Sequence, residues 1–176
     1  GGSILMSAPT IISIMGLAGA GKTTTAKALA KELKARGEQV IIIDGDEFRG
    51  IFGLGKYDKA SRIAYTAQRT ALCIGLAKQD FIVINAIISL FNESYELIKD
   101  LTSQTNIKHK QYYLKCPIDE LEKRDQKELY SKAKVGKMRN VVGVDIGFDE
   151  PNADLVCDGT ACVDENVKKI IKDLGL

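Results

Sequence analysis

Short runs of apolar, β-branched residues alternate along the chain with longer amphipathic segments. The apolar runs, each about as long as one buried strand, lie at 10–15, 39–43, 81–85, 111–114 and 154–157. The segments between them predict helices at about 24–33, 59–78, 92–101 and 163–174, and Pro117 opens one more. Because near-continuous apolar strands alternate with helices, the pattern predicts an α/β fold with a parallel sheet covered by helices on both faces.

The composition indicates one ordinary folded domain. The chain has 176 residues, of which 45% are hydrophobic and 27% charged, with a formal net charge of +2. Such a balance gives no indication of nucleic-acid binding, and no apolar run approaches the roughly 20 residues that span a bilayer. We therefore expect a cytoplasmic protein that binds neither nucleic acid nor membrane. Its single domain is expected over 6–176, with residues 1–5 as a remnant of cloning.

The cysteines and the single histidine form no recognisable metal or catalytic motif. The cysteines are Cys73, Cys116, Cys157 and Cys162. They contain no C-x-x-C pair, and most lie in apolar stretches, so buried free thiols are favoured over disulfides or a metal site. His109 lies in the polar stretch 106–110, which predicts a solvated loop position.

The segment after the first predicted strand matches a phosphate-binding loop. Residues 16–23 read GLAGAGKT, the pattern G-x-x-x-x-G-K-[ST], between a strand and a helix. Glycines let backbone N–H groups converge on phosphate oxygens, and the helix N-terminus adds partial positive charge. Lys22 is expected to reach the β- and γ-phosphates of ATP, and the Thr23 hydroxyl to ligate Mg²⁺. A chance match in a glycine-rich turn is the alternative. The predicted nucleotide-binding residues of the loop are Gly16, Ala18, Gly19, Ala20, Gly21, Lys22, Thr23 and Thr24.

A phosphate loop of this kind occurs in kinases, GTPases and ATP-driven motors. The chain is short for a motor, and it contains no N-K-x-D motif of the kind that reads guanine in GTPases. Small kinases therefore remain the favoured class.

An acidic segment follows the second predicted strand. Ligands of open α/β sheets bind beyond the carboxyl ends of strands, so Asp44 and Asp46 are expected to face the same crevice as the phosphate loop. On an extended chain, residues two apart point the same way, and two carboxylates can orient an attacking hydroxyl and support Mg²⁺. Arg49 is expected to hold a phosphate of the acceptor bidentately. A simple Asp-Gly turn is the alternative.

The segment from about 126 to 151 breaks the alternation of strands and helices. It is rich in lysine, arginine and glycine and has little apolar periodicity. A solvated helix and loop is one interpretation. A basic lid that closes over bound phosphates is the other, and the phosphate loop favours it.

These residues together resemble the adenylylsulfate (APS) kinase family over nearly all of 10–159. The matching pieces are 16–24, 43–46 with Arg49, 88–89, 124–133 and 142–145. Segment 124–133 reads RDQKELYSKA and is similar to the family's lid signature R-D-P-K-G-L-Y-x-K-A. The resemblance implies a P-loop kinase with a parallel five-stranded sheet and a basic lid. Such a kinase transfers the γ-phosphoryl group of MgATP to the 3′-hydroxyl of a small nucleotide with a 5′ mixed anhydride. The family is commonly dimeric, which implies a homodimer.

The resemblance also assigns roles to residues. It implies that Asp46 contacts the acceptor 3′-hydroxyl and guides its proton, and that Asp44 supports Mg²⁺ and Asp46. Arg124 and Lys127 would bring positive charge to the phosphates as the lid closes. Ser89 matches a serine described in the family as a phosphoserine intermediate, but direct in-line transfer needs no such intermediate, so we interpret Ser89 as an acceptor-positioning hydroxyl. The predicted catalytic residues are thus Lys22, Asp44, Asp46, Ser89 and Lys127.

Departures from the family pattern concentrate where the acceptor is expected. The family has F-S-x-x-D-R-x-x-N-I-R-R, whereas residues 54–65 read LGKYDKASRIAY. Leu54 stands at the phenylalanine and Lys59 at the arginine, which loses a bidentate fork. Arg62 stands at the asparagine and Ala64 at the first arginine of the final pair.

The other departures concern aromatic residues. The family's I-S-P-Y is ISLF at 88–91, and its lid phenylalanine is Val141. Two positions that resemble the clamp on the acceptor's adenine, Leu54 and Val141, are thus aliphatic, and Tyr57 is the candidate to replace one of them. Because base–aromatic stacking contributes on the order of 1–3 kcal/mol per base, acceptor choice is expected to change. The predicted acceptor-binding residues are Asp46, Arg49, Leu54, Tyr57, Lys59, Arg62, Ile88, Ser89, Phe91, Lys127 and Val141.

Two acceptors are consistent with this pattern. One is APS itself, in a divergent pocket. The other is cytidine diphosphoramidate, the substrate of the kinase branch in capsule phosphoramidate synthesis, and its smaller pyrimidine and non-sulfate head favour it. A hypothesis from another class is a nucleotide-binding regulatory module without turnover. The retained residues disfavour it, and they are Lys22, Thr23, Asp44, Asp46, Lys127 and Ser89.

Overall fold

A computed structural model describes residues 8–51, 56–125 and 128–176, apart from the side chain of Asp46. Its five strands form one sheet in the order β2-β3-β1-β4-β5, and every neighbouring pair is parallel. The strands are β1 (Thr10–Met15), β2 (Val40–Ile43), β3 (Ile82–Ile87), β4 (Lys108–Lys115) and β5 (Leu155–Asp158). The predicted parallel five-stranded sheet is therefore confirmed.

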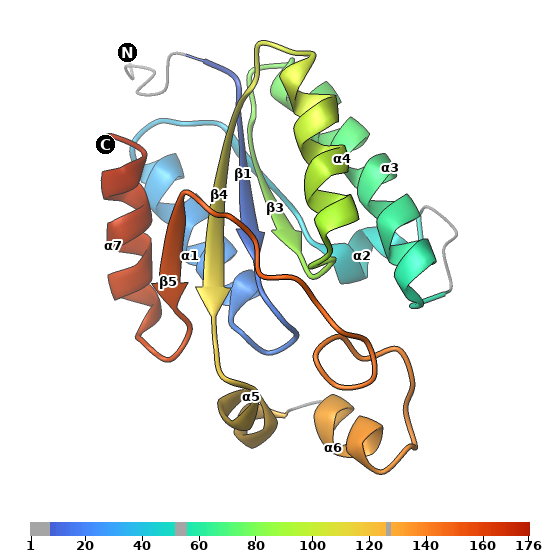
Figure 1. Cartoon of the computed structure of the whole chain (residues 1–176). Helices are drawn as coiled ribbons and strands as arrows, with labels where there is room; N and C mark the ends of the chain where they lie inside the picture. Colours follow the sequence, from blue (N-terminus) through green and yellow to red (C-terminus); the bar gives the residue numbers. More distant parts are fainter. Residues whose placement is uncertain (1–7, 52–55, 126–127) are drawn as a thin grey trace.

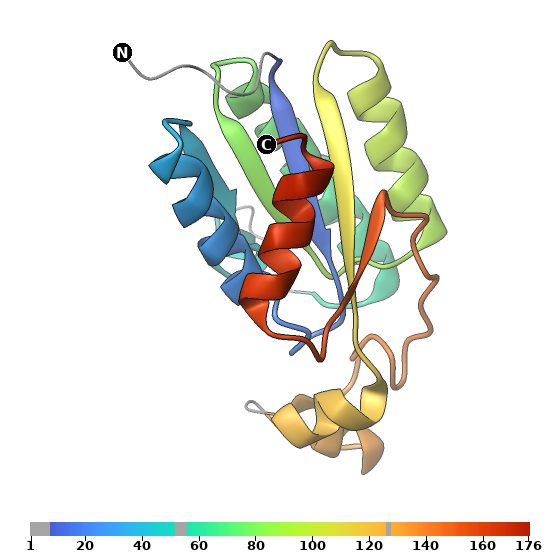
Figure 2. The same cartoon turned by 90° about the vertical axis from the view of Figure 1, so that its left-hand side faces the viewer.

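Helices cover both faces of the sheet (Figures 1 and 2). On one face α1 (Lys22–Ala35) packs beside α7 (Val163–Asp173), and on the other α3 (Lys59–Ala77) packs beside α4 (Asn92–Ser103). Three short helices lie beyond the carboxyl ends of the strands: α2 (Gly45–Arg49), α5 (Ile118–Arg124) and α6 (Leu129–Lys134). The pattern of apolar positions did not indicate α2, because one turn and a half of helix shows no periodicity.

Burial explains why the central strands are so apolar. All residues of β1 and β3 are buried, since each strand has a neighbour on both sides and helices on both faces. At the start of α3, the Asp58 carboxylate accepts hydrogen bonds from the Ser61 hydroxyl at 2.7 Å and from the Ser61 N–H at 3.2 Å. These bonds lower the pKa of Asp58 and fix the point at which α3 begins.

The expectation of a solvated loop at His109 is wrong. β4 begins earlier than the apolar run 111–114, because its polar first residues pair with β1, with Lys108 beside Thr10. His109 therefore lies within the sheet, where its Nε2 is 2.7 Å from the Ser13 hydroxyl. Burial lowers the pKa of His109 to about 4.

The cysteines are free thiols, as the sequence predicted. Cys73, Cys116 and Cys157 are buried, whereas Cys162 is exposed.

Candidate active site

One cavity of about 770 Å³ lies beyond the carboxyl ends of the strands. Its walls come from the phosphate loop (16–23), the turn from β2 into α2, one face of α3, the link from β3 to α4, and parts of 121–125 and 129–142. This is the end of the sheet at which the sequence predicted ligand binding, as parallel strands bring their carboxyl ends together.

The phosphate loop owes its shape to its backbone. Gly19 and Gly21 have φ angles of +84° and +95°, which residues with a side chain rarely adopt. Gly21 is also the N-cap of α1. A Cβ at Gly16 would lie 3.1 Å from the Leu114 carbonyl oxygen, so the loop passes close beside β4. The loop-end residues that line the cavity are Ala18, Gly19, Gly21, Lys22, Thr23 and Thr24, whereas Gly16 and Ala20 only shape the loop.

Lys22 and Thr23 lie where the loop runs into α1. The Lys22 ammonium donates to the Leu17 carbonyl at 2.8 Å, which keeps this cation over the loop. The Thr23 hydroxyl donates to the Asp44 carboxylate at 2.7 Å, so the structure brings together the two residues predicted to hold Mg²⁺. A hydroxyl and a carboxylate oxygen suit Mg²⁺, which takes oxygen ligands and fills its other positions with water and phosphate. In the described part of the chain, no three acidic, histidine or cysteine residues form a larger metal site.

The arrangement of Asp44 and Asp46 differs from the extended chain that the sequence suggested. Asp44 follows the last residue of β2, but helix α2 begins at Gly45. Asp46 is therefore helical, and the rule that alternate residues share a side does not apply. The Asp46 side chain lies outside the described part, as do Leu54 and Lys127.

Three buried arginines from α2 and α3 also line the cavity. Arg49, Arg62 and Arg69 are 8%, 6% and 5% exposed. The hydrogen-bond acceptors that the structure gives them are carbonyl and amide oxygens, including the Lys56 carbonyl at 2.8 Å from Arg49 and the Tyr57 carbonyl at 2.7 Å from Arg62. Burial, together with the charge of Arg49, lowers the pKa of Arg62.

Two tyrosine rings complete this wall, which we call the arginine pocket (Arg49, Tyr57, Arg62, Tyr65 and Arg69). The Arg49 guanidinium lies 4.0 Å from the ring centroid of Tyr57 and 5.1 Å from that of Tyr65. Tyr57 is 46% exposed, so part of its ring is open to a ligand. The Tyr65 ring is buried, and its hydroxyl donates to the Gly45 carbonyl at 3.1 Å.

Tyr65, Thr66 and Arg69 were missed by the sequence reasoning. With Arg62 they recur at three- and four-residue spacing on α3, and all four line the cavity. This spacing places them on one helix face, so a buried face that carries two arginines was the available signal.

The link from β3 to α4 contributes Ile88 and Ser89 to the cavity. Ser89 is buried, and its hydroxyl lies 2.7 Å from the Ser94 hydroxyl. Phe91 packs in the core at 1% exposure, and the Lys59 ammonium, 3.2 Å from the Glu93 carboxylate, lies 5.1 Å from the Phe91 ring centroid. Lys59 and Phe91 are thus not among the described residues that line the cavity.

Arg124 and parts of the described segment 128–146 pack against the phosphate loop. Arg124 donates to the Gly159 carbonyl at 2.9 Å, and more weakly to the Gly19 carbonyl at 3.4 Å. Val141 lines the cavity, and its N–H donates to the Asp145 carboxylate at 2.7 Å. Farther along, a Cβ at Gly143 would lie 3.2 Å from Leu17 of the phosphate loop.

Two hydrogen bonds join the predicted lid segment to the phosphate loop and to α3. The Tyr130 hydroxyl of α6 donates to the Ala18 carbonyl, and Arg62 of α3 donates to the Asn140 carbonyl at 2.8 Å. The predicted basic lid is therefore anchored to both walls, and its Tyr130 and Val142 are buried in the main core rather than solvated.

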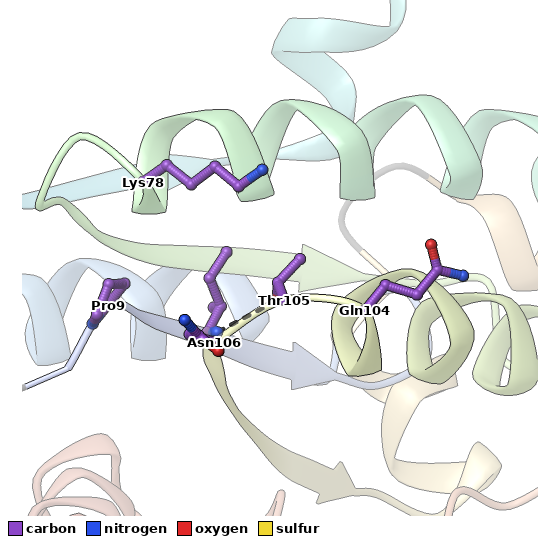
Figure 3. Close-up of a pocket in the computed structure, with 6 residues that line it drawn as sticks. Pro9, Lys78, Gln104, Thr105 and Asn106 are labelled. Carbon is purple, nitrogen blue, oxygen red and sulfur yellow. Dashed lines mark hydrogen bonds between the residues drawn. The ribbon is translucent and has the colours of Figure 1, made fainter.

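A second hollow, of about 400 Å³, lies at the opposite end of the sheet, beside the start of β1 (Figure 3). Its lining includes Pro9, Lys78 and Thr105, and the Thr105 hydroxyl accepts a hydrogen bond from the Ile107 N–H at 3.1 Å. None of the residues predicted for a site lies there.

The family profile described as adenylylsulphate kinase matches residues 8–158. The cytidine diphosphoramidate kinase of Campylobacter jejuni subsp. jejuni serotype O:2 is 42% identical over 170 residues, which cover 96% of this chain and 98% of that protein. The adenylyl-sulfate kinase of Bacillus velezensis is 37% identical over 158 residues, which cover 87% of this chain and 78% of that protein.

A solved structure agrees with the sequence comparisons. The Mycobacterium tuberculosis APS kinase CysC in complex with AMPPNP and APS matches with a TM-score of 0.90 and 25% sequence identity, covering 95% of this chain and 98% of that chain.

Proposed function

The chain belongs to the adenylylsulfate kinase family, and on that premise we propose that it transfers the γ-phosphoryl group of ATP to the 3′-hydroxyl of a small nucleotide. The observation that carries the proposal is a single cavity that is lined both by the phosphate loop and by the arginine pocket. Such a cavity accommodates a phosphate donor and an anionic acceptor together. In phosphoryl transfer the protein acts mainly by positioning the two and by stabilising charge.

The donor is held by the phosphate loop. Lys22 would contact the β- and γ-phosphates, and Thr23 with Asp44 would hold Mg²⁺, since their side-chain oxygens lie 2.7 Å apart. When bound, Mg²⁺ would supply neutralisation of the negative charge that develops on the phosphates during transfer. Arg124, which contacts the Gly19 carbonyl, adds positive charge on the same side, and Lys127 joins it from the lid.

The acceptor is held by the arginine pocket. The guanidinium groups of Arg49 and Arg62 bind its anionic end, and Tyr57, which is partly open to the cavity, stacks on its base. Ser89 positions the acceptor through its hydroxyl, and Asp46 guides the 3′-hydroxyl proton during direct in-line transfer.

We propose cytidine diphosphoramidate as the acceptor, with APS as the second candidate. An aliphatic residue, Val141, lines the cavity where the family pattern has phenylalanine, and a small pyrimidine depends less on stacking than adenine does. The relative in Campylobacter jejuni, whose similarity spans nearly the whole chain, is named for this acceptor. APS is supported by the family profile and by the Bacillus velezensis relative.

ADP release by the purified protein with MgATP tests the proposal. We expect kcat/KM for cytidine diphosphoramidate to exceed that for APS by about tenfold or more, the effect of one altered base contact. Cytidine diphosphate, which lacks the amide, serves as the control for the head group. Faster phosphorylation of APS would overturn the choice of acceptor. ATP binding without release on addition of any acceptor would instead indicate the non-catalytic module.

Assembly and location stay predictions. The homodimer and the cytoplasmic location rest on the family resemblance and the composition. Within residues 8–51, 56–125 and 128–176, the structure contains no helix that is long and apolar enough to cross a membrane.

A further inference from the structure

Arg69 of α3 is a buried cation that contacts the backbone on either side of Asp44. Its Nη2 donates to the carbonyl of Ile43, the residue before Asp44, at 3.2 Å. The same nitrogen donates to Asn85 Oδ1 and to the Ala86 carbonyl on β3, at 2.5 Å each. One guanidinium therefore joins the carboxyl ends of two neighbouring strands, next to Asp44 of the proposed Mg²⁺ site.

The other end of the guanidinium lies against Gly45, the residue after Asp44. A Cβ at Gly45 would lie 3.0 Å from Arg69 Nη1, so a side chain there would press on the guanidinium. Tyr65, one turn earlier on α3, donates its hydroxyl to the Gly45 carbonyl at 3.1 Å, and its ring centroid lies 5.3 Å from the Arg69 guanidinium. Together the two side chains hold the first residue of α2.

The burial of Arg69 is costly for the fold. Burial lowers the pKa of Arg69, whereas the nearby negative charge of Asp44 acts in the opposite direction. Within the described part of the chain, Arg69 Nε is buried with no hydrogen-bond partner. An apolar side chain of similar size would stabilise the core at least as well as a buried arginine does. The presence of Arg69 therefore indicates a role in the site.

We propose that Arg69 is a positioning residue, which fixes the turn from β2 into α2 so that Asp44 stays in reach of Thr23. The Thr23–Asp44 hydrogen bond of 2.7 Å depends on where this turn lies, and Arg69 contacts both neighbours of Asp44. The expected effect on turnover rests on the proposed function. The effect on the binding of MgATP does not.

The test compares ATP binding by the full chain in Mg²⁺ and in excess EDTA. Residues that orient metal ligands typically contribute about 10–100-fold to metal affinity or activity. We expect Arg69→Met to weaken binding of MgATP by about tenfold, to leave binding of metal-free ATP unchanged, and to lower kcat by about a hundredfold with little change in acceptor KM. Arg69→Lys, which keeps the charge, should recover part of both losses.

Two further variants keep the test decisive. Gly45→Ala adds the Cβ that presses on Arg69, so it should shift Mg²⁺-dependent binding in the same direction but less, even if Arg69→Met fails to fold in a thermal melt. Arg36→Met is the matched control, because Arg36 forms a surface ion pair with Glu32 at 3.1 Å, away from the cavity.

The outcomes separate the possible roles. MgATP binding by Arg69→Met and Gly45→Ala equal to that of the unmodified protein would overturn the proposal. A rise in acceptor KM alone would also overturn it, in favour of direct contact between Arg69 and the acceptor. If the unmodified protein phosphorylates neither acceptor, the proposed function fails, while the comparison of Mg²⁺-dependent binding still decides the role of Arg69.

Discussion

The phosphate loop and the arginine pocket line one cavity, but different contacts hold them in place. The phosphate loop is one continuous segment shaped by its own backbone, with positive φ at Gly19 and Gly21 and the Lys22 ammonium bonded back to Leu17. The arginine pocket is assembled from side chains of separate segments. Its hydrogen bonds include one between Arg62 and Asn140, which are 78 residues apart.

This difference means that donor and acceptor binding can change separately. The loop pattern is complete from 16 to 23, whereas the departures from the family pattern fall at 54–65, at 90–91 and at Val141. Side chains of the arginine pocket that are proposed to reach the acceptor, such as Tyr57 and Arg62, can be exchanged without moving the backbone of the phosphate loop, whereas Arg69 lies beside Asp44 and belongs to the donor side. A family can therefore keep its chemistry and change its acceptor.

The largest expected effect is in the phosphate loop. Lys22→Met should lower kcat by about 10²–10³-fold, the usual effect of removing one group that stabilises charge in the transition state. Because the donor is common to every acceptor, the loss should be the same with cytidine diphosphoramidate and with APS in an ADP-release assay. Lys27→Met, on the exposed side of α1, is the control. A loss confined to one acceptor would break the separation of the two regions.

A smaller and more selective effect is expected in the arginine pocket. Arg62→Met removes a guanidinium that we propose binds the anionic end of the acceptor, and hydrogen bonds to charged groups contribute about 1.5–3 kcal/mol. Acceptor KM should therefore rise by about tenfold or more while the KM for ATP stays constant. Steady-state kinetics with each substrate varied in turn measure both values, and Arg62→Lys, without the fork, should be intermediate. An equal rise in the KM for ATP would contradict independent regions.

Substitution of Tyr57 should have a weaker effect on kcat/KM for the acceptor, because only part of its ring is open to the cavity. Tyr57→Ala is expected to lower kcat/KM for the acceptor by about fivefold, the low end of base–aromatic stacking. Tyr57→Phe keeps the ring and should behave like the unmodified protein. If Tyr57→Phe shows the same loss as Tyr57→Ala, the hydroxyl rather than the ring contacts the acceptor.

The smallest effect on activity is expected at His109, which lies in neither region. Burial lowers its pKa to about 4 from 6.5, so the folded state disfavours protonation. Neutral His109 makes its full contribution to the free energy of unfolding above pH 6.5, and this contribution is lost as the pH falls towards 4. We expect the unfolding free energy to decrease by about 2–3 kcal/mol over this range.

Urea titrations at several pH values measure this decrease. His109→Gln should reduce the loss between neutral and acidic pH and leave kcat at neutral pH unchanged. An identical pH dependence in the variant would show that other groups, such as the carboxylates, cause the whole loss.

The fold was largely predictable because its signals are local. Apolar runs of strand length and the amphipathic segments between them indicated each strand and all the longer helices. The exceptions have physical causes. β4 begins with polar residues because it pairs along the whole of β1, and α2 is too short to show periodicity.

The candidate site was predictable only on one side. Thr23 and Asp44 could be paired because a loop motif and a strand end both point to the same edge of the sheet, and the structure brings them to 2.7 Å. Tyr65 and Arg69 gave only the weaker signal of helical spacing. Phe91 and Lys59, chosen from the family pattern, lie outside the lining of the cavity.

By itself the sequence determined the parallel sheet, the phosphate loop and the class of chemistry, because each depends on neighbours along the chain. Only the tertiary structure decided that Arg69 contacts both sides of Asp44 and that Arg62 reaches Asn140. These contacts follow from the packing of α3 against the sheet and from the position of residues 140–142 in the wall of the cavity. Sequence spacing carries no information about contacts of that kind, because the residues meet through separate elements.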